Sequence, residues 1–468
     1  MSDIVLYDHQ NICVDEIRTS FKDKNSAPLF VLPTGGGKTV IFCHIAKQTA
    51  LNSKRVWILV HRVELLRQTS KSLTKSGVHH GLINPKYTPD FNAPVQVASV
   101  QTVINRLSKL PPPDLIIIDE AHHATAGSWK KIIDFFPEAR ILGVTATPTR
   151  ADGKGLGIDY GGCFDDLIIG PQIGELIDMG FLVKPIVYAP KKRIDFSKVN
   201  LLKNGDYDPS ETLEIMDKPT ITGDAVKHYM KICSGVPAVA FCVSISHAEH
   251  VAEEFRAAGF RAYSVDGSMD DSTRKRILEG LGDGSIDVVT SCDLISEGTD
   301  IPAIGCAILL RPTNSLSLFI QQGGRALRIL NGKSHAIILD HVGNTFNHGF
   351  LDSEREWSLE GKKKKTKKND SEKTIRVVQC KECYAVYEPS PKCTYCGFVS
   401  PVRETEPEKV DGELQEITDE QKAIIKKNQR QQVGMAKTLE QLQELGKQRG
   451  YKPGWAKQMF KARNEKLI

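Results

Sequence analysis

Short apolar runs alternate with longer mixed segments along the first 350 residues of the chain. A run of aliphatic residues such as "LIIID" at 115–119 is typical of a strand that is buried on both faces of a parallel sheet. These runs form two series. The first series is 29–32, 56–60, 95–100, 115–119 and 140–146, and the second is 238–243, 261–265, 287–291, 306–310 and 336–340.

Segments between these runs, such as "SHAEHVAEEFRAAG" at 246–259, have the mixed composition of helices. Strands that alternate with helices predict a parallel sheet flanked by helices, and two series predict two tandem α/β domains. We expect the first domain at 1–182 and the second at 220–350. The apolar rhythm is lost in 183–219, which we interpret as the connection between them.

Beyond residue 350 the alternating pattern stops, and the composition predicts four further segments. They are a basic linker at 351–376, a compact cysteine module at 377–400, an acidic linker at 401–420 and a basic helical tail at 421–468. Two helix starts have the form of a capping box, Thr418 with Gln421 and Thr438 with Gln441.

Charge is distributed unevenly along the chain. Residues 1–350 carry 37 basic and 38 acidic side chains, whereas 421–468 carry 12 basic and three acidic ones. A basic end suggests a polyanionic partner, and a solubilising tail is the alternative.

Composition excludes some classes of protein. The chain has 468 residues, of which 40% are hydrophobic and 25% are charged, as in globular proteins. No apolar run reaches the roughly 18 residues of a membrane helix, and "MSDIVLYDHQ" does not resemble a signal peptide. We therefore expect a cytoplasmic protein without a membrane partner. Seven scattered cysteines read as small core residues of a reducing compartment.

A glycine-rich turn joins the first expected strand to a helix in "LFVLPTGGGKTVIFCHIA". After Thr34, residues Gly35, Gly36 and Gly37 allow backbone N–H groups to converge on a phosphate, and the helix start adds its dipole. Lys38 can reach the β- and γ-phosphates of ATP, and Thr39 can bind Mg²⁺. One departure from the general phosphate-binding loop is Leu32, where that pattern has glycine.

Two adjacent carboxylates, Asp119 and Glu120, end the buried run at 115–119. Unpaired buried charge is costly, so this pair must face a cation, a donor or water. Because strand ends of a parallel sheet meet at one crevice, Asp119 can bind the Mg²⁺ that Thr39 contacts. Glu120 can then orient and deprotonate the attacking water.

Taken together, five motifs resemble those of superfamily 2 helicases, and most closely the XPB/UvsW-like branch. They are "VHRVELLRQ" at 60–68, "DEAH" at 119–122, "TAT" at 145–147, "SEGTDIP" at 296–302 and "QQGGRALR" at 321–328. The resemblance covers about residues 5–345. It implies two RecA-like lobes with ATP between them.

The resemblance also implies residue roles. Gln10 would read adenine, and Asp300 would lie near the ribose and the interface between the lobes. His122, Thr145 and Thr147 would couple the ATP site to the polynucleotide. Gln321, Arg325 and Arg328 would act from the second lobe, where an arginine neutralises charge on the γ-phosphoryl group. The second series lacks a glycine loop, which indicates a single composite ATP site.

One face of both lobes is expected to contact a nucleic-acid backbone through hydroxyl, amide and basic groups. The candidates are His61, Arg62, Ser99, Gln101, Thr102, Ser244, Thr290 and Ser291. By resemblance, "TAT" and "QxxGRxxR" favour DNA, single-stranded or branched, over RNA.

Four cysteines in the cysteine module form two CxxC pairs that are typical of a closed, structural Zn²⁺ site, and an iron cluster or a redox pair is the alternative. They are Cys380, Cys383, Cys393 and Cys396. The module is thus expected to be a zinc ribbon that serves as an accessory DNA-binding unit. Its aromatic residues Tyr384, Tyr387, Tyr395 and Phe398 either stack on bases or form the core of this small module. The tail places Trp455 and Phe460 among basic residues, which suits either a nucleic acid or a protein partner.

The sequence therefore predicts a Mg²⁺- and ATP-dependent DNA helicase or translocase. The alternatives are a DNA-stimulated ATPase switch that does not unwind, an RNA helicase, and a binding protein with a degenerate site. Replication, repair or nuclease proteins are the partner classes that the resemblance suggests.

Overall fold

The computed structural model describes residues 5–124, 127–150, 153–190, 196, 199–202, 205–216, 219–292, 304–360, 377–380, 382–399, 438–448, 456 and 460. They belong to two units, Met1–Ser400 and Pro401–Ile468, which are described separately.

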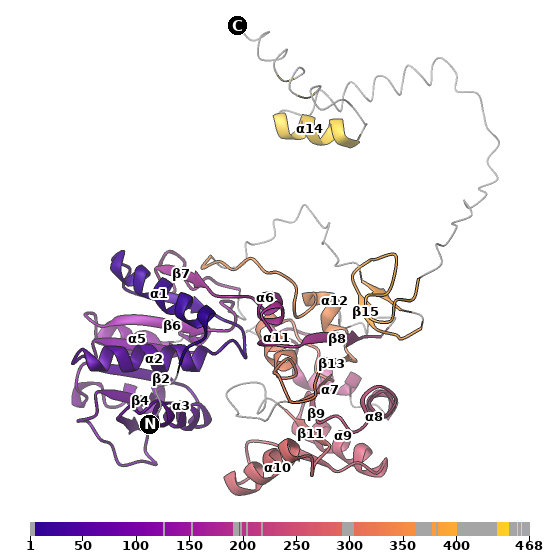
Figure 1. Cartoon of the computed structure of the whole chain (residues 1–468), viewed down its shortest axis with the longest axis horizontal. Coiled ribbons are helices and arrows are strands. Elements are labelled where there is room, and N and C mark those ends of the chain that lie inside the picture. Colours follow the sequence, from indigo (N-terminus) through magenta and orange to yellow (C-terminus); the bar gives the residue numbers. More distant parts are fainter. Residues whose placement is uncertain are drawn as a thin grey trace, which may run out of the picture. The chain divides into compact units, whose positions relative to one another are not determined.

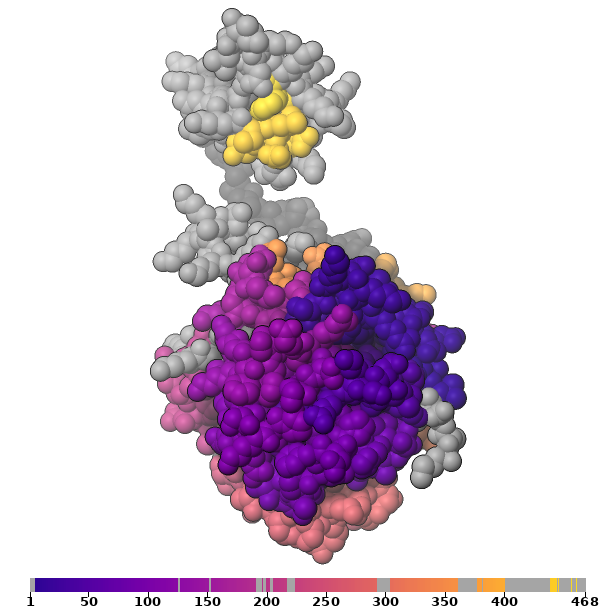
Figure 2. All heavy atoms as spheres, turned by 90° about the vertical axis from the view of Figure 1, so that its left-hand side faces the viewer, coloured from indigo at the N-terminus to yellow at the C-terminus, as the bar shows by residue number. Residues whose placement is uncertain are grey.

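The first lobe of the larger unit is a seven-stranded parallel sheet with the order β3-β4-β2-β5-β6-β1-β7. Its strands are β1 (Pro28–Val31), β2 (Val56–Val60), β3 (His80–Ile83), β4 (Val95–Ser99), β5 (Leu115–Asp119), β6 (Arg140–Thr145) and β7 (Asp166–Ile169). Its helices are α1 (Asp8–Lys22), α2 (Lys38–Leu51), α3 (Val63–Lys75), α4 (Val100–Ile104) and α5 (Gly127–Phe135). Helix α6 (Ile173–Asp178) follows β7 in the chain but packs into the core of the second lobe. In Figure 2, residues of this lobe, from indigo to magenta, form most of the visible face.

Both faces of the first sheet are buried, which explains the uninterrupted aliphatic runs. Ile117 of β5 packs into one core cluster, whereas Ile116 and Ile118 pack into the cluster on the opposite face. The five strands expected here are confirmed. The sequence did not indicate β3 and β7, because these four-residue edge strands are only partly buried and mix polar with apolar residues.

The second lobe is an eight-stranded sheet with the order β10-β11-β9-β12-β13-β8-β15-β14. Its strands are β8 (Lys184–Tyr188), β9 (Ala238–Phe241), β10 (Ala262–Val265), β11 (Val288–Ser291), β12 (Cys306–Leu309), β13 (His335–Asp340), β14 (Val378–Gln379) and β15 (Val386–Tyr387). Its helices are α7 (Pro209–Met216), α8 (Pro219–Cys233), α9 (Ile245–Ala257), α10 (Asp271–Asp283), α11 (Leu316–Gly324) and α12 (Asn344–His348).

All five strands expected for the second lobe are present, but the lobe begins earlier than 220. Strand β8 lies inside the expected connection and pairs in parallel with β13. A lysine and a proline at its start, in "KPIVY", hide its apolar character in the sequence.

The cysteine module extends the second sheet. Strand β15 pairs with β8 in antiparallel fashion, with Val386 opposite Val187 (Figure 1). The hydroxyl of Tyr395 donates to the carbonyl of Pro185 at 3.2 Å, and Gln379 Nε2 donates to the carbonyl of Ala189 at 3.1 Å. The module is therefore packed against the second lobe and covers the edge of β8.

Ion pairs join the two lobes between α3 and α10. Arg67 Nη2 lies 2.8 Å from Asp271 Oδ2, and Arg274 Nη2 lies 3.2 Å from Glu64 Oε1. Arg274 also pairs with Asp271 of its own helix. Arg274 is buried although charged, because two carboxylates surround it.

The smaller unit contains α14 (Leu439–Gln448), which begins with the expected capping box. Thr438 N donates to Gln441 Oε1, and Gln441 N donates to Thr438 Oγ1, both at 3.2 Å. Phe460 packs with Leu442 of α14, which favours a core role for this aromatic residue. Trp455 and the other expected box, Thr418 with Gln421, lie outside the described residues.

Among the described residues, no helix combines the length and the apolar character that crossing a bilayer requires.

Candidate ATP-hydrolysis site and nucleic-acid track

The phosphate-binding turn lies between β1 and α2, as expected. Gly35 and Gly37 have φ angles of +93° and +97°, which only glycine adopts without strain. There is also no room for side chains. A Cβ atom at Gly37 would lie 2.2 Å from Gln10 Nε2, and one at Gly35 would lie 2.7 Å from Leu182 Cδ2.

Leu32 stands where the general phosphate-binding loop has glycine. Its side chain is fully buried beneath the turn. A Cβ atom at Gly36 would lie 2.8 Å from Leu32 Cγ, so the leucine packs against the loop from below. The Leu32 carbonyl accepts a 3.0 Å hydrogen bond from Lys38 Nζ. Leucine at position 32 is therefore compatible with the loop, and its carbonyl holds the side chain of Lys38 across the turn.

Gln10 lies against the same turn, at the start of α1. Its Oε1 accepts a 3.1 Å hydrogen bond from Tyr7 N, and its amide contacts Gly37. The neighbouring His9 places Nε2 3.2 Å from the carbonyl of Gly36. The structure thus brings Gln10 to the phosphate turn and adds His9, whose role the sequence did not indicate.

Asp119 and Glu120 lie at the end of β5. Burial raises the pKa of Asp119 to about 7, and the nearby charge of Glu120 acts in the same direction. Lys38 opposes this rise in pKa. A divalent cation nearby would favour the ionised form of this carboxylate. The oxygen atoms of Asp119 and Thr39 are ligands that suit Mg²⁺.

Glu120 has a strained backbone, with φ 51° and ψ 52°. Its Oε2 atom is buried, accepts no hydrogen bond from the described residues and lies 3.5 Å from His122 Nδ1. An unsatisfied carboxylate oxygen beside a histidine suits a base that awaits a water molecule.

A chain of short contacts leads from His122 to the second lobe. His122 Nδ1 lies 3.1 Å from Thr145 Oγ1, and Thr145 Oγ1 donates to the Thr147 carbonyl at 3.0 Å. Thr147 Oγ1 donates to Ser317 Oγ at 2.6 Å. Because Ser317 belongs to α11, these contacts connect the region of the Glu120 carboxylate with the helix that precedes the arginines.

Residues of the second lobe lie close to the phosphate turn. A Cβ atom at Gly35 would lie 3.9 Å from Arg328 Cγ, and one at Gly324 would lie 3.7 Å from Thr34 Cβ. Burial lowers the pKa of Lys38, and the nearby charges of Arg325 and Arg328 lower it further. The two arginines and the lysine therefore belong to one site.

Gln321 is buried on α11 at 3% exposure, and neither its Nε2 nor its Oε1 atom has a hydrogen-bond partner among the described residues. An amide left in this way at the lobe interface fits a bound ligand with donors and acceptors. Asp300, the remaining expected residue, lies outside the described residues, as does the whole motif at 296–302.

The expected nucleic-acid contacts are only partly available. Arg62 and Gln101 are partly or fully accessible at the starts of α3 and α4, whereas Ser99 and Thr102 are nearly buried. Ring centroids of His61 and His123 are 5.0 Å apart.

In the second lobe, the structure contradicts the assignment of Thr290. Its side chain is fully buried, and its hydroxyl donates to the Ala248 carbonyl at 2.7 Å, so it cannot contact a phosphate. Ser291 is buried without a hydrogen-bond partner for its Oγ among the described residues, and Ser244 accepts a hydrogen bond from His247 N. Both lie where β11 and β9 end.

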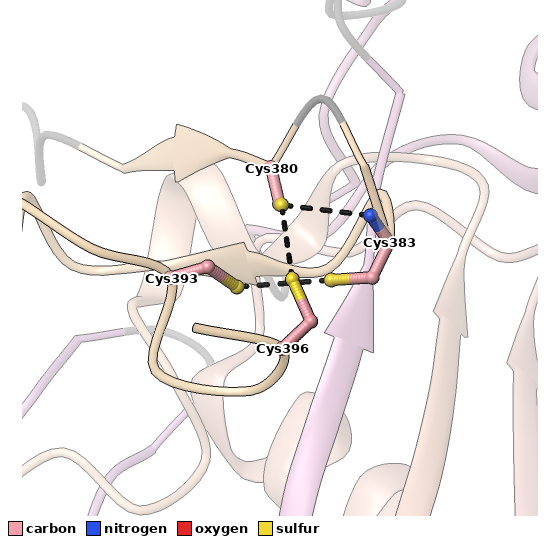
Figure 3. Close-up of side chains that lie close together, drawn as sticks. All are labelled: Cys380, Cys383, Cys393 and Cys396. Atoms are coloured by element: carbon pink, nitrogen blue, oxygen red, sulfur yellow. Dashed lines mark hydrogen bonds between the residues drawn. The ribbon is translucent and has the colours of Figure 1, made fainter. Parts of the chain in front are cut away.

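Four cysteines converge in the cysteine module (Figure 3), with all four sulfur atoms within 4.8 Å of one another. Cys380 Sγ lies 3.5 Å from Cys396 Sγ, and Cys383 Sγ lies 3.7 Å from Cys393 Sγ. Four thiolates at Zn–S bonds of about 2.3 Å are separated by about 3.8 Å in a tetrahedron. The cluster therefore fits a structural zinc ion.

Backbone N–H groups also point at this cluster. Burial alone would raise the pKa of Cys380, but hydrogen bonds from Cys383 N and Glu382 N outweigh it, and the pKa is about 7. Such donors favour the thiolate that a metal needs.

The aromatic residues of the module are mostly structural. Tyr387 is buried, Tyr395 is bonded to the second lobe, and Phe398 packs against the cysteine cluster. Only Tyr384 is exposed, at 44%.

Besides His9, the sequence did not indicate Ser317 or the residues of the ion pairs between α3 and α10. Ser317 lies one helical turn before Gln321, so the i, i+4 spacing in "SLFIQ" could have placed both on one face of α11. For Arg274 and Glu64 no local signal exists, because their contact depends on how the lobes pack.

Known families match both lobes. Residues 3–150 match the model described as "Type III restriction enzyme, res subunit", and residues 224–330 match "Helicase conserved C-terminal domain".

Individual proteins are also similar. The "51.5 kDa protein" of a Lactococcus phage (isolate 7-9) is 36% identical over 399 residues, which cover 84% of this chain and 83% of that protein. "Putative ATP-dependent helicase IRC3" of Saccharomyces cerevisiae is 32% identical over 72% of this chain, which spans only 52% of the yeast protein. The Type ISP restriction-modification enzyme LlaBIII, solved bound to DNA, shares the fold with a TM-score of 0.55 at 18% identity, over 72% of this chain and 28% of that chain.

Proposed function

The chain belongs to the superfamily 2 helicases, and we propose that it uses the site between its lobes to hydrolyse ATP while moving along or unwinding DNA. The observation that carries this proposal is the closeness of the two lobes at the phosphate turn, where a Cβ atom placed on Gly35 would lie 3.9 Å from Arg328 Cγ. A nucleotide bound at this turn would be touched from both sides.

Each residue of the site then has a chemical task. The N–H groups of the glycine turn and Lys38 bind the phosphates, and Gln10 is positioned for the base. Thr39 and Asp119 would hold Mg²⁺, which when bound neutralises phosphate charge. Glu120 orients the attacking water and accepts its proton.

The arginines complete the site only when the lobes meet. Arg325 and Arg328 offset the charge that develops on the transferred phosphoryl group. ATP therefore favours closure, and hydrolysis favours opening. Through Thr147 and Ser317, this change reaches the face that is expected to contact the polynucleotide.

DNA is the proposed polymer. The "TAT" and "QxxGRxxR" motifs support this choice by their resemblance. The XPB/UvsW-like branch and the cytoplasmic location stay predictions.

We further propose that the four cysteines hold a structural Zn²⁺ ion. Four thiolates leave no open coordination position, so this metal would stabilise the module rather than take part in hydrolysis.

Parallel ATPase assays with single-stranded DNA, forked DNA and RNA, at one stated salt concentration, test the proposal. We expect stimulation by DNA and a much weaker response to RNA. Equal or stronger stimulation by RNA would contradict the assignment of the polymer. Strand displacement measured in the same reactions distinguishes unwinding from translocation without unwinding.

A further inference from the structure

A cavity of about 690 Å³ lies between the second lobe and the cysteine module. Its walls come from the ends of β8 and β13, from α8 and from the module. The lining residues used below are Tyr188, His228, Lys231, His341, Gln379 and Tyr384. Its volume is in the range of pockets that bind small organic molecules.

Planar rings line the wall together with one basic residue, Lys231, and two acidic residues, Asp340 and Glu382. The rings of His228 and His341 are 5.2 Å apart, and Lys231 Nζ lies 4.8 Å from the centroid of the Tyr384 ring. Flat faces of this kind stack on flat ligands.

Two wall residues carry a buried polar atom that has no hydrogen-bond partner among the described residues. They are His341 Nε2 and Gln379 Oε1. Burial, with His228 close by, lowers the pKa of His341 to about 3, so its ring is neutral at pH 7. A ligand with donors and acceptors along one edge would satisfy both groups.

The position of the cavity narrows the choice of ligand. Tyr188 and His341 lie at the carboxyl ends of β8 and β13, and Ser244 and Ser291 lie at the carboxyl ends of β9 and β11. All four strands run parallel in one sheet, in which β12 lies between β13 and β9. The cavity therefore opens at the same sheet edge as the expected nucleic-acid contacts.

The geometry points to a binding pocket for a nucleobase of the tracked strand, which stacks between the rings of the second lobe and Tyr384 of the cysteine module. This inference rests on the proposed function, because it needs a strand on the track. In this arrangement the cysteine module binds the nucleic acid directly. The binding is independent of nucleotide sequence, because every base has a face that can stack.

The test compares two strands of equal length on the full chain, oligo-dT and the same backbone without bases. Contacts to the backbone bind both, whereas the pocket binds only the first. The wild type is expected to bind oligo-dT about tenfold more tightly than the abasic strand. Tyr384→Ala and His228→Ala should each lower the affinity for oligo-dT severalfold and leave the affinity for the abasic strand unchanged.

Two variants are used because they lie on different elements and both side chains are exposed. His228 is on α8, so its replacement leaves the cysteine module intact. Tyr263→Ala on β10, with Tyr263 exposed to 47%, is the matched control and should bind both strands as the wild type does.

The outcomes separate the two claims. If the wild type binds neither strand, the proposed function fails and the pocket fails with it. If the wild type binds but the two variants keep its full preference for oligo-dT, the pocket is wrong while the proposed function stands. An equal loss of affinity for both strands would also overturn the pocket.

Discussion

At the scale of single residues, the most informative position is Glu120. Its left-handed backbone costs on the order of 1–3 kcal/mol, and its buried Oε2 has no hydrogen bond to the described residues. A protein keeps such strain where the geometry serves function. Here the strain turns the residue after a buried strand so that its carboxylate lies beside His122.

Replacing Glu120 by glutamine keeps the shape of the side chain and removes the base. We expect ATP hydrolysis to fall by about 10²–10⁴-fold, with nucleotide binding retained. Phosphate release and binding of a fluorescent ATP analogue, measured on the same preparation, check this. Hydrolysis at the wild-type rate would show that Glu120 is not the base.

The hydrogen bond between Thr147 and Ser317 predicts a coupling effect. Thr147→Val and Ser317→Ala should each leave basal hydrolysis largely intact and reduce its stimulation by DNA, because the link between the lobes is lost. In a double-mutant cycle the two losses should not add, since they remove the same contact. Fully additive losses would mean that the two hydroxyls act independently.

The positions of single residues in the candidate site were the feature that the sequence predicted best. Lys38, Asp119 and Arg328 were identified from their motifs, and the structure brings them to one site. Thr290 was wrong, because a hydroxyl residue at a strand end can face the protein as well as the solvent, and sequence does not reveal which. Ser317 was missed because it belongs to no motif that the sequence analysis recognised.

At the scale of elements, α3 and α10 hold the lobes together through Arg67, Asp271, Arg274 and Glu64. Salt weakens the exposed pair of Arg67 and Asp271 more than the pair that the buried Arg274 makes with Glu64. These ion pairs hold the two lobes together, and they would break if the lobes moved apart.

Arg274→Ala removes the better-buried half of this contact and leaves Glu64 without its partner across the lobes. We expect a more open protein with a larger radius of gyration, measured by small-angle X-ray scattering, and a smaller effect of salt than in the wild type. Lys275→Ala, which removes only a surface pair within α10, is the control. Identical scattering of wild type and Arg274→Ala would contradict this role.

The same contact predicts a pH dependence. The hydrogen bond from Arg67 lowers the pKa of Asp271 below its ordinary value. The stabilisation is therefore complete at neutral pH and is lost only as the pH falls below about 4.

The cysteine module makes a second prediction at this scale, because β15 covers the edge of β8. Zinc removal by a chelator should lower the melting temperature of the second lobe, by about 2–4 °C for each kcal/mol lost. Cys396→Ser should reproduce the effect without chelator, and Cys163→Ser, far from the cluster, should not. A metal-free protein with an unchanged melting temperature would show that the cysteines do not stabilise this edge.

At the scale of the whole molecule, the alternation of strands and helices was sufficient to predict two α/β lobes. It did not predict where the second lobe begins or that the cysteine module joins its sheet. Both depend on short strands, β8, β14 and β15, whose pairing partners are distant in sequence. A pattern within a few residues cannot specify such pairing.

The central claim is that ATP is hydrolysed only where the phosphate turn and the arginines of the other lobe meet. The most direct test is the DNA-stimulated ATPase rate of Arg328→Ala, with ATP affinity and melting temperature measured alongside. We expect a rate lower by about 10³-fold or more in a folded protein that still binds ATP. Hydrolysis by this variant at the wild-type rate would contradict it.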